Sequence, residues 1–421
     1  MAAKFGLDTL AKVATSVCDK PRLSRSRRRA SPVCSPDLAR TASIEISVSY
    51  DTPGRNAAPP GARPPPHMMP VAASMRRRLV VVAFCGAGGS SLGVHAALPN
   101  ANVVGIDNDA DACRTHRAAG FATIQAEAAT FPLERLGGAQ GLWLSPPCTA
   151  FSTAGRQSAV RHMPALLGYL RKWRLGDPTW DGPPPVWLVT EPLRWALAIG
   201  PEWVTCEQVP EVLPLWHALA GRLRGVGYSA WAGVLNAADY GVPQTRRRAI
   251  LMASRSRQAV PPVPTHARSP QARLDGTELP AWATMAGALE RRGLCHGQLP
   301  RWCYERPATT VQGDRRIGRP GHKDRGGGEG QFDRDAVTLS LDGLAALQDF
   351  PPGYRFAGSA SSATKQVGNA VPVGLAAAVV GALTGSDEKG RVGHALSPDE
   401  GRLVAEILAA SRAELDWLKE H

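Results

Sequence analysis

We expect this chain to fold as an α/β protein, with a doubly wound, mostly parallel sheet and a smaller, irregular region beside it. Short apolar segments alternate with helix-like segments from Leu79 to about Ser254, which is typical of parallel sheets covered by helices. A glycine-rich turn follows the first apolar segment and opens a helix. After Ser254 the alternation stops, and prolines and scattered basic residues take its place.

The apolar segments predict the strands of the sheet. The first strand runs from Leu79 to Phe84, and the second runs from Asn102 to Ile106 and ends in Asp107. Further strands are expected at 123–124, 141–144, 203–206, 231–235 and 249–253. The helices between and after them are expected to end at Leu98 and Arg117 and to cover 188–199, 212–223 and 373–383. Such helical crossovers are what parallel strands require.

The composition divides the chain into five parts. Residues 1–75 are rich in Pro, Arg, Ser and Ala, so we expect disorder there, with a translation start possible at Met75. A core domain (76–255) follows, and then a region (256–365) that contains a glycine-rich loop; we call 256–365 the small region. A helix at 366–385 returns to the core domain, and 386–421 is expected to be a helical tail that begins at Ser397.

The net positive charge of the chain favours a polyanionic partner. The 421 residues carry a net charge of +13, of which residues 1–75, with 11 Lys/Arg and 5 Asp/Glu, contribute +6. The eight cysteines show no CxxC pair and no Cys/His ligand spacing, so we expect reduced thiols and no metal. No apolar run approaches the roughly 20 residues that span a membrane. We therefore expect a cytoplasmic protein without a membrane partner.

The segment Ser145-Pro146-Pro147-Cys148 presents a thiol directly after the apolar strand at 141–144. The two prolines exclude helix at this point and stiffen the turn. The carboxyl ends of strands are where open α/β sheets place their chemistry. Most cysteines are small buried hydrophobic residues, so the meaning of Cys148 depends on what other segments bring to the same edge of the sheet.

The segment from Phe84 to Gly93 follows a strand, and its glycines allow a ligand to approach the backbone closely. By itself such a turn indicates a nucleotide-like cofactor, including NAD or FAD. Asp107 ends the second strand, where it suits ribose hydroxyl groups, although a cap for the next helix is an equally good interpretation.

Two further segments carry charge to strand ends. Glu207 follows an apolar strand, where desolvation can raise the pKa of a carboxyl group, and a solvated loop carboxylate is the alternative. In the segment 244–248, strand alternation places Arg246 and Arg248 on one face. Two guanidinium groups on one face suit a phosphate or a polarised carbonyl, although such a run is often a solvated basic edge.

The order of these segments resembles that of the DNA cytosine-5 methyltransferase family, over about residues 80–383. The segments that carry the resemblance are 84–93, Asp107, Glu127, Pro146-Pro147-Cys148 with Phe151-Ser152, Glu191, Glu207-Gln208-Val209, Gln244 with Arg246 and Arg248, 306–311 and 366–372. Each is weak or moderate by itself, whereas their conjunction in this order is specific.

The resemblance implies a Rossmann-like methyltransferase fold, with the small region as a target-recognition domain. The implied cofactor is S-adenosyl-L-methionine, bound by Phe84, Gly86, Gly88, Gly89, Asp107, Glu127, Pro146 and Asn369. The implied catalytic residues are Cys148, Glu207, Arg246 and Arg248. The implied partner is double-stranded DNA. The implied enzyme is a monomer, encoded by a bacterium or a phage, that associates with the nucleoid by binding DNA.

This chain departs from the family pattern at four places. Val82 and Ala83 stand where an acid usually precedes the phenylalanine, Gln208 replaces an asparagine, Thr149 a glutamine and Glu127 an aspartate. None of these changes removes a group that makes or breaks a bond. Three alternatives remain: an enzyme that methylates cytosine in transfer RNA, a nucleic-acid-binding relative with impaired catalysis, and a nicotinamide oxidoreductase. The oxidoreductase would leave Cys148 without a purpose.

Overall fold

The computed structural model describes residues 79–147, 150–151, 159–174, 186–273, 275–294, 299–318 and 336–386. All of them belong to one unit, Met68–His421. The predictions for the extension 1–75, for Cys148, for the glycine-rich loop of the small region and for the helix from Ser397 concern residues outside this set.

The core of the fold is a seven-stranded sheet with the order β3-β2-β1-β4-β5-β7-β6. Its strands are β1 Leu79–Ala83, β2 Asn102–Asp107, β3 Ala122–Gln125, β4 Gly141–Leu144, β5 Trp203–Gln208, β6 Ser229–Asn236 and β7 Arg247–Ser254. The first five strands pair in parallel, whereas β7 runs antiparallel to both of its neighbours. The predicted fold class is confirmed.

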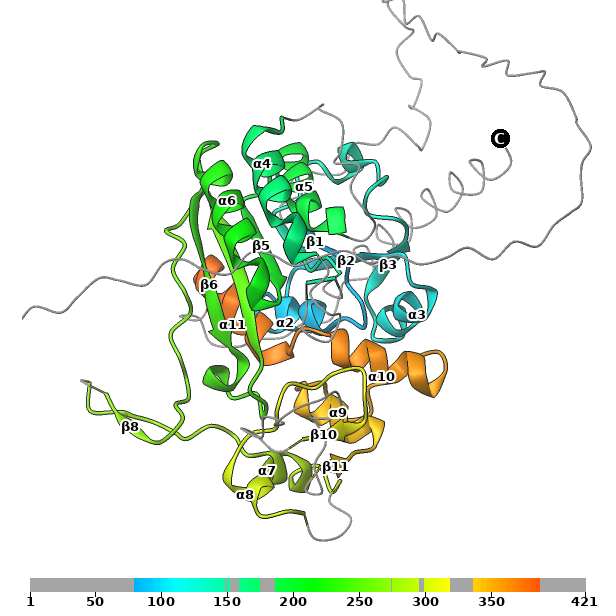
Figure 1. Cartoon of the computed structure of the whole chain (residues 1–421), viewed down its shortest axis with the longest axis vertical. Coiled ribbons are helices and arrows are strands. Elements are labelled where there is room, and N and C mark those ends of the chain that lie inside the picture. The colour runs from blue at the N-terminus through cyan, green and yellow to red at the C-terminus, as the bar shows by residue number, and fades with distance from the viewer. Residues whose placement is uncertain are drawn as a thin grey trace, which may run out of the picture. The chain divides into compact units, whose positions relative to one another are not determined.

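Helices cover both faces of the sheet (Figure 1). They are α2 Gly89–Ala97, α3 Ala110–Ala118, α4 Met163–Lys172, α5 Glu191–Ile199, α6 Leu213–Arg224 and α11 Val373–Thr384. Helix α10, Ala360–Asn369, precedes α11 and packs on α3 rather than on the sheet. Alternate strand residues point to opposite faces, so Val81 and Leu142 pack against α4, α5 and α6, while Val82 and Trp143 pack against α2 and α11. The result is a three-layer sandwich.

Several element boundaries differ from the prediction by one to three residues, and two of these differences have a clear physical reason. Strand β5 continues through Glu207 and Gln208, because both residues pair with β7, at Ile250 and Ala249. Helix α5 begins at Glu191 rather than at Leu188, after a 3₁₀ turn at Val186–Thr190. Its proline lies in the first turn, the only helical position where proline is well tolerated.

The small region builds its own core from α7 Met285–Glu290, α8 Trp302–Glu305 and α9 Leu341–Leu347. Two short strand pairs accompany these helices, β8 Gln271–Ala272 with β9 Glu278–Leu279 and β10 Arg316–Ile317 with β11 Val337–Thr338.

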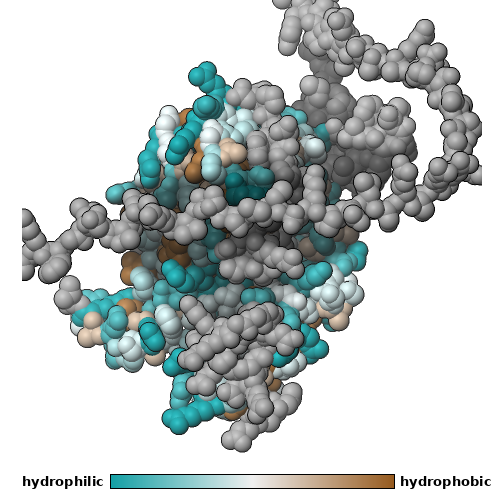
Figure 2. Space-filling model, viewed as in Figure 1, coloured by the Kyte–Doolittle hydropathy of each residue, from teal (hydrophilic) through white to brown (hydrophobic). Residues whose placement is uncertain are grey.

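In the view of Figure 2, hydrophobic side chains of the described residues show only as small areas between hydrophilic ones.

The segment expected to be a single returning helix, 366–385, is divided. Its first residues end α10, and the rest forms α11 after Pro372. The stretch Ala360–Thr384 is apolar and long enough to cross a membrane by composition, yet 61% of its most apolar window is buried inside the fold. Packing of α11 on α2 and the sheet accounts for this apolar character.

His116 joins three elements beside the glycine turn. The ring is fully buried; its Nδ1 lies 2.7 Å from Thr123 Oγ1 and its Nε2 lies 2.7 Å from Ser91 Oγ. Burial, assisted by Arg117, lowers the pKa of His116 to about 3. The imidazole is therefore neutral in the folded protein, whereas in the unfolded chain it takes up a proton below its ordinary pKa of about 6.5.

This difference predicts a loss of stability as the pH falls from about 6.5 towards 3, and the full contribution of His116 is present above 6.5. Between pH 7 and pH 5 the free energy of unfolding should fall by about 2 kcal/mol more in the wild-type protein than in His116→Gln. Urea unfolding of both proteins at the two pH values measures the difference. Equal losses in the two proteins would contradict the assignment.

Candidate active site

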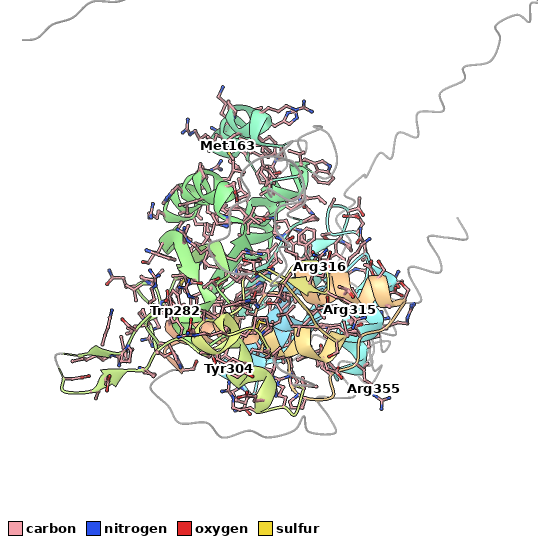
Figure 3. The ribbon with its side chains drawn as sticks, turned by 60° about the horizontal axis from the view of Figure 1, so that its bottom comes forward. Met163, Trp282, Tyr304, Arg315, Arg316 and Arg355 are labelled. Atoms are coloured by element: carbon pink, nitrogen blue, oxygen red, sulfur yellow. The ribbon has the colours of Figure 1, made fainter. Side chains whose placement is uncertain are left out.

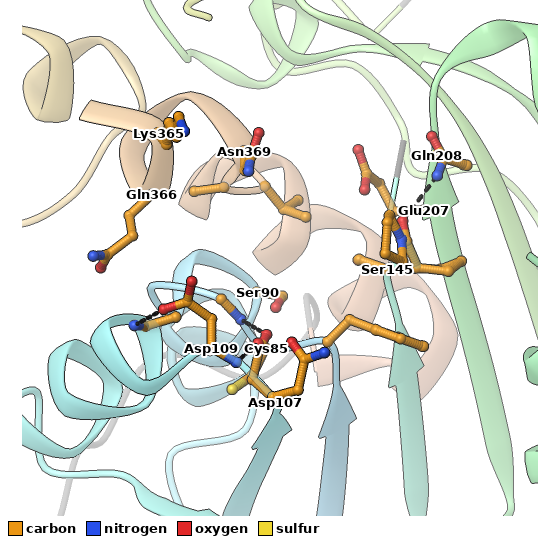
Figure 4. A pocket seen from close by; sticks show the side chains of 18 of the residues that line it. Cys85, Ser90, Asp107, Asp109, Ser145, Glu207, Gln208, Lys365, Gln366 and Asn369 are labelled. Atoms are coloured by element: carbon orange, nitrogen blue, oxygen red, sulfur yellow. Dashed lines mark hydrogen bonds between the residues drawn. The ribbon is translucent and has the colours of Figure 1, made fainter. Parts of the chain in front are cut away.

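A pocket of about 460 Å³ opens at the carboxyl ends of the central strands, between them and α10 (Figure 4). Its walls come from the glycine turn, the ends of β2 and β5, the segment after β4, the start of β7, and α10 with the turn that follows it. The lining residues with polar side chains or predicted roles are Phe84, Cys85, Gly86, Ser90, Asp107, Asn108, Asp109, Ser145, Pro146, Pro147, Glu207, Gln208, Arg246, Arg248, Ser359, Ser361, Ser362, Lys365, Gln366 and Asn369.

The glycine turn contributes only part of itself to the pocket. Phe84 and Gly86 line it, and both adopt positive φ angles, 58° and 52°. A Cβ on Gly86 would meet nothing within 4 Å, whereas a Cβ on Gly89 would lie 2.1 Å from the carbonyl oxygen of Val371. A Cβ on Gly88 would crowd the ring of His116 at 2.9 Å. Gly88 and Gly89 thus permit close packing, and Gly86 faces open space.

Asp107 organises the part of the pocket beside the glycine turn. Its Oδ2 accepts a hydrogen bond from the backbone N–H of Gly86 (2.8 Å), and its Oδ1 accepts one from Asp109 (2.9 Å). Burial raises the pKa of the Asp107 carboxyl group, and these two backbone donors act in the opposite direction. The side-chain cap of α3 is Asp109, which accepts from the N–H of Ala112. Asp107 therefore joins the glycine turn to the N-cap residue of α3, while Asp109 supplies the side-chain cap itself.

Glu127 lies at the edge of the site. Its side chain is exposed and accepts a hydrogen bond from Asn108 Nδ2 (2.9 Å), and Asn108 itself lines the pocket. The sequence did not single out Asn108, although its position directly after Asp107 could have suggested it.

Pro146 is held in place by a buried glutamine. Gln208 Nε2 donates to the carbonyl oxygen of Pro146 (2.8 Å), and Gln208 Oε1 accepts from the N–H of Val209 (2.6 Å). The Gln208 side chain is 1% exposed. The residue that appeared in the sequence only as a departure from the family pattern thus contacts the segment leading to Cys148.

Glu207 and Arg248 form an ion pair inside the pocket. Arg248 Nε lies 3.0 Å from Glu207 Oε1, and their side chains are 11% and 9% exposed. Both residues come from neighbouring strands that pair directly. A carboxylate and a guanidinium therefore meet where β5 ends and β7 begins, close to Pro146 and Pro147.

Arg246 also reaches the pocket, but its terminal nitrogens bind the backbone. Nη1 donates to the carbonyl of Val311 (2.9 Å) and Nη2 donates to that of Gly368 (3.0 Å). The residue is 2% exposed. Arg246 and Arg248 both line the pocket, as alternation predicted. Arg246 binds backbone carbonyls of two other segments, whereas Arg248 pairs with the Glu207 carboxylate.

Helix α10 supplies the wall opposite the strands. Lys365 and Asn369 are exposed, line the pocket and stand four residues apart, a spacing that places them on one face of the helix. Lys365 was missed in the sequence, although this spacing from Asn369 was the available signal. Among the residues that the structure describes, no group of three His, Cys, Asp or Glu side chains could hold a metal ion.

Comparison with known proteins shows the family of the chain. A family model for C-5 cytosine-specific DNA methylases matches residues 80–170, 186–286 and 301–385. The Type II methylase M.HgiDII of Herpetosiphon aurantiacus is 27% identical over 269 residues, which is 49% of this chain and 69% of that protein. The Type II methyltransferase M.AquIA of a Picosynechococcus strain is 30% identical over 233 residues, which is 49% of this chain and 85% of that protein.

A solved structure supports the fold. The methyltransferase EhMeth of Entamoeba histolytica matches with a TM-score of 0.50 at 13% sequence identity, covering 75% of this chain and 99% of that one. At this identity the likeness concerns the fold.

The two glycines predict losses of stability of different size on replacement by alanine. Gly89→Ala should destabilise the protein by about 3 kcal/mol, because its methyl group would overlap a backbone carbonyl. Gly86→Ala should cost only about 1–2 kcal/mol, for the left-handed backbone. Gly168→Ala, in α4 with open space around it, is the control and should stabilise by about 0.5–1 kcal/mol. Urea unfolding measures all three, and equal losses for Gly86 and Gly89 would contradict the contact.

Proposed function

The chain belongs to the C-5 cytosine-specific DNA methylase family and is a DNA cytosine-5 methyltransferase, and from this premise we propose how its residues divide the reaction. The observation that carries the proposal is that one pocket joins two groups of side chains. Phe84, Gly86 and Asp107 line one part, and Pro146 and Glu207 line another. A methyl donor and a cytosine ring need such adjacent places.

The first part suits S-adenosyl-L-methionine, the methyl donor that the family and the fold imply. The space beside Gly86 leaves room for a ligand, and the partly exposed Asp107 carboxylate offers acceptors for ribose hydroxyl groups. Asn108, with Glu127 behind it, would bound the adenine side, and Asn369 the opposite wall. When bound, S-adenosylmethionine supplies the electrophilic methyl group that carbon 5 of cytosine accepts.

The second part would receive the cytosine. Carbon 6 is inaccessible in duplex DNA, so the base must leave the helix, at a cost of a few kcal/mol. We propose that the Cys148 thiolate forms a bond to carbon 6. Glu207 would donate a proton to ring nitrogen 3, which makes carbon 5 nucleophilic. After methyl transfer, a water molecule or hydroxide would take the carbon 5 proton and the Cys148 thiolate would leave carbon 6. Nitrogen 3 would return its proton to Glu207, and 5-methylcytosine would be released.

Arg248 would bind the flipped cytosine by exchanging its ion-pair partner, Glu207, for the carbonyl of the ring. The ring carbonyl of the entering cytosine offers the guanidinium a second acceptor, and this releases the Glu207 carboxyl group to carry the proton for nitrogen 3. Arg246 has a different role in this scheme. Its terminal nitrogens already bind Val311 and Gly368, so it positions the pocket walls rather than the base.

The small region would contact the duplex around the flipped base. Tyr304 is 46% exposed, and Arg315, Arg316 and Arg355 are exposed on the same region (Figure 3). Arginines at such positions suit DNA phosphates, which carry no sequence information by themselves. We propose that the enzyme acts as a monomer on bacterial or phage DNA in the cytoplasm, like Type II modification enzymes.

Replacement of the nucleophile gives the first test. Cys148→Ala should lose methyl transfer from labelled S-adenosylmethionine to unmethylated duplex DNA, while S-adenosylhomocysteine still raises the melting temperature. Cys303→Ala, at a buried cysteine outside the pocket, should retain activity. Label in DNA that bisulfite sequencing maps to cytosines supports the proposal, and label only in a parallel transfer RNA reaction would overturn the substrate. Turnover by Cys148→Ala would overturn the nucleophile.

The contact of Gln208 with Pro146 predicts a second effect. Gln208→Leu removes the donor that holds the carbonyl two residues before Cys148, so kcat should fall about 10–100-fold, as expected for a displaced catalytic group. Thr190→Val, which removes another buried hydrogen bond, is the control and should keep kcat within about twofold. Single-turnover kinetics at saturating DNA and cofactor measure the effect. An unchanged kcat in Gln208→Leu would argue against a positioning role.

A further inference from the structure

The turn between α10 and α11, residues 370–372, forms part of the pocket wall. Ala370 and Val371 line the pocket directly. The same turn rests on the glycine turn, since the carbonyl oxygen of Val371 occupies the place where a Cβ on Gly89 would project. A displacement of this turn would therefore change both the wall and the glycine turn of the cofactor part.

Gln348 binds this turn from the small region. It follows α9, is fully buried, and donates from Nε2 to the carbonyls of Val367 (2.6 Å) and Ala370 (3.2 Å). Its backbone carbonyl accepts from the N–H of Val373 (3.2 Å), the first residue of α11. One residue thus contacts the end of α10, the turn and the start of α11. Its Oε1 accepts from Gln244 Nε2 (2.7 Å), which anchors it to the segment before β7.

Asp349 adds a contact to the next residue of α11. Its carboxylate accepts from the backbone N–H of Gly374, and a Cβ on Gly374 would lie 3.1 Å from Asp349 Oδ2. The backbone of Asp349 has a φ of 64°, in the left-handed region that non-glycine residues rarely occupy and that Asp and Asn tolerate best. Such a conformation persists where the surrounding contacts enforce it.

We propose that Gln348 and Asp349 form a clamp that positions the turn 370–372 for cofactor binding. Neither residue lines the pocket, so both are positioning residues that act through Ala370, Val371 and Asn369. The inference rests on the proposed binding of S-adenosylmethionine in this pocket. It adds that the small region, besides facing DNA, sets the affinity of the cofactor site.

The first test removes the donors of Gln348. Gln348→Met keeps the length of the side chain but loses its hydrogen bonds, and the dissociation constant of S-adenosylhomocysteine, measured by calorimetry, should rise about tenfold. The KM for S-adenosylmethionine should rise in parallel, with a smaller change in kcat. Gln348→Glu keeps the acceptor for Gln244 but turns an oxygen towards two carbonyls, so it should bind the cofactor at least as weakly.

A role in folding alone would give a different pattern. It would lower the active fraction, and hence kcat, without changing the dissociation constant measured on the folded protein. Tyr228→Phe, which deletes a buried hydrogen bond to Pro201 away from the pocket, controls for lost stability and should leave the dissociation constant unchanged.

The second test uses the backbone of Asp349. Asp349→Asn retains an acceptor and tolerates the left-handed conformation, so cofactor affinity should stay within about twofold of the wild type. Asp349→Ala loses both advantages and should weaken binding several-fold. If the wild-type protein binds S-adenosylhomocysteine and both Gln348→Met and Asp349→Ala bind it equally well, the clamp is overturned. If the wild-type protein itself fails to bind it, the proposed cofactor site is overturned instead.

Discussion

The buried guanidinium of Arg246 is the contact on which the rest of the pocket depends. A charge removed from water is tolerated only where hydrogen bonds replace its solvation, and here the carbonyls of Val311 and Gly368 supply them. These two residues belong to segments far apart in the sequence. If either segment moved away from β7, the buried guanidinium would lose a hydrogen bond that replaces its solvation. Two walls of the pocket, the start of β7 and α10, are thereby fixed to each other and to the segment of Val311 at a single side chain.

Close backbone packing is a consequence of this arrangement. A Cβ on Gly368 would lie 2.3 Å from the carbonyl carbon of Gln312, so the segment drawn in by Arg246 leaves no room for a side chain there. Gln244 adds to the same junction, since its Oε1 accepts from the N–H of Val311 (3.1 Å) and its Nε2 donates to the carbonyl of Leu347 (2.7 Å). The small region is therefore joined to the sheet through polar groups of the backbone, not only through apolar surface.

The sequence predicted the strands and the residues at their ends, because local periodicity determines them. It did not predict contacts between residues that are far apart in the chain. Strand alternation and turn residues located all seven strands and placed Asp107 at a strand end, because these signals lie within a few residues. The extension of β5 through Glu207 depends on pairing with β7, some forty residues later in the chain. The different duties of Arg246 and Arg248 were hidden for the same reason. Both have the same local pattern, and only the fold shows which acceptors each one meets.

The ion pair of Glu207 and Arg248 constrains how the reaction can begin. In the free enzyme the Glu207 carboxylate is held by the Arg248 guanidinium at 3.0 Å. In the proposed mechanism, Glu207 must leave this ion pair before it can donate a proton to ring nitrogen 3. The cytosine carries the required acceptor in its own carbonyl, next to nitrogen 3, so its entry exchanges one partner of Arg248 for another. The acid would thus be prepared by the substrate it serves, without a separate movement of the chain.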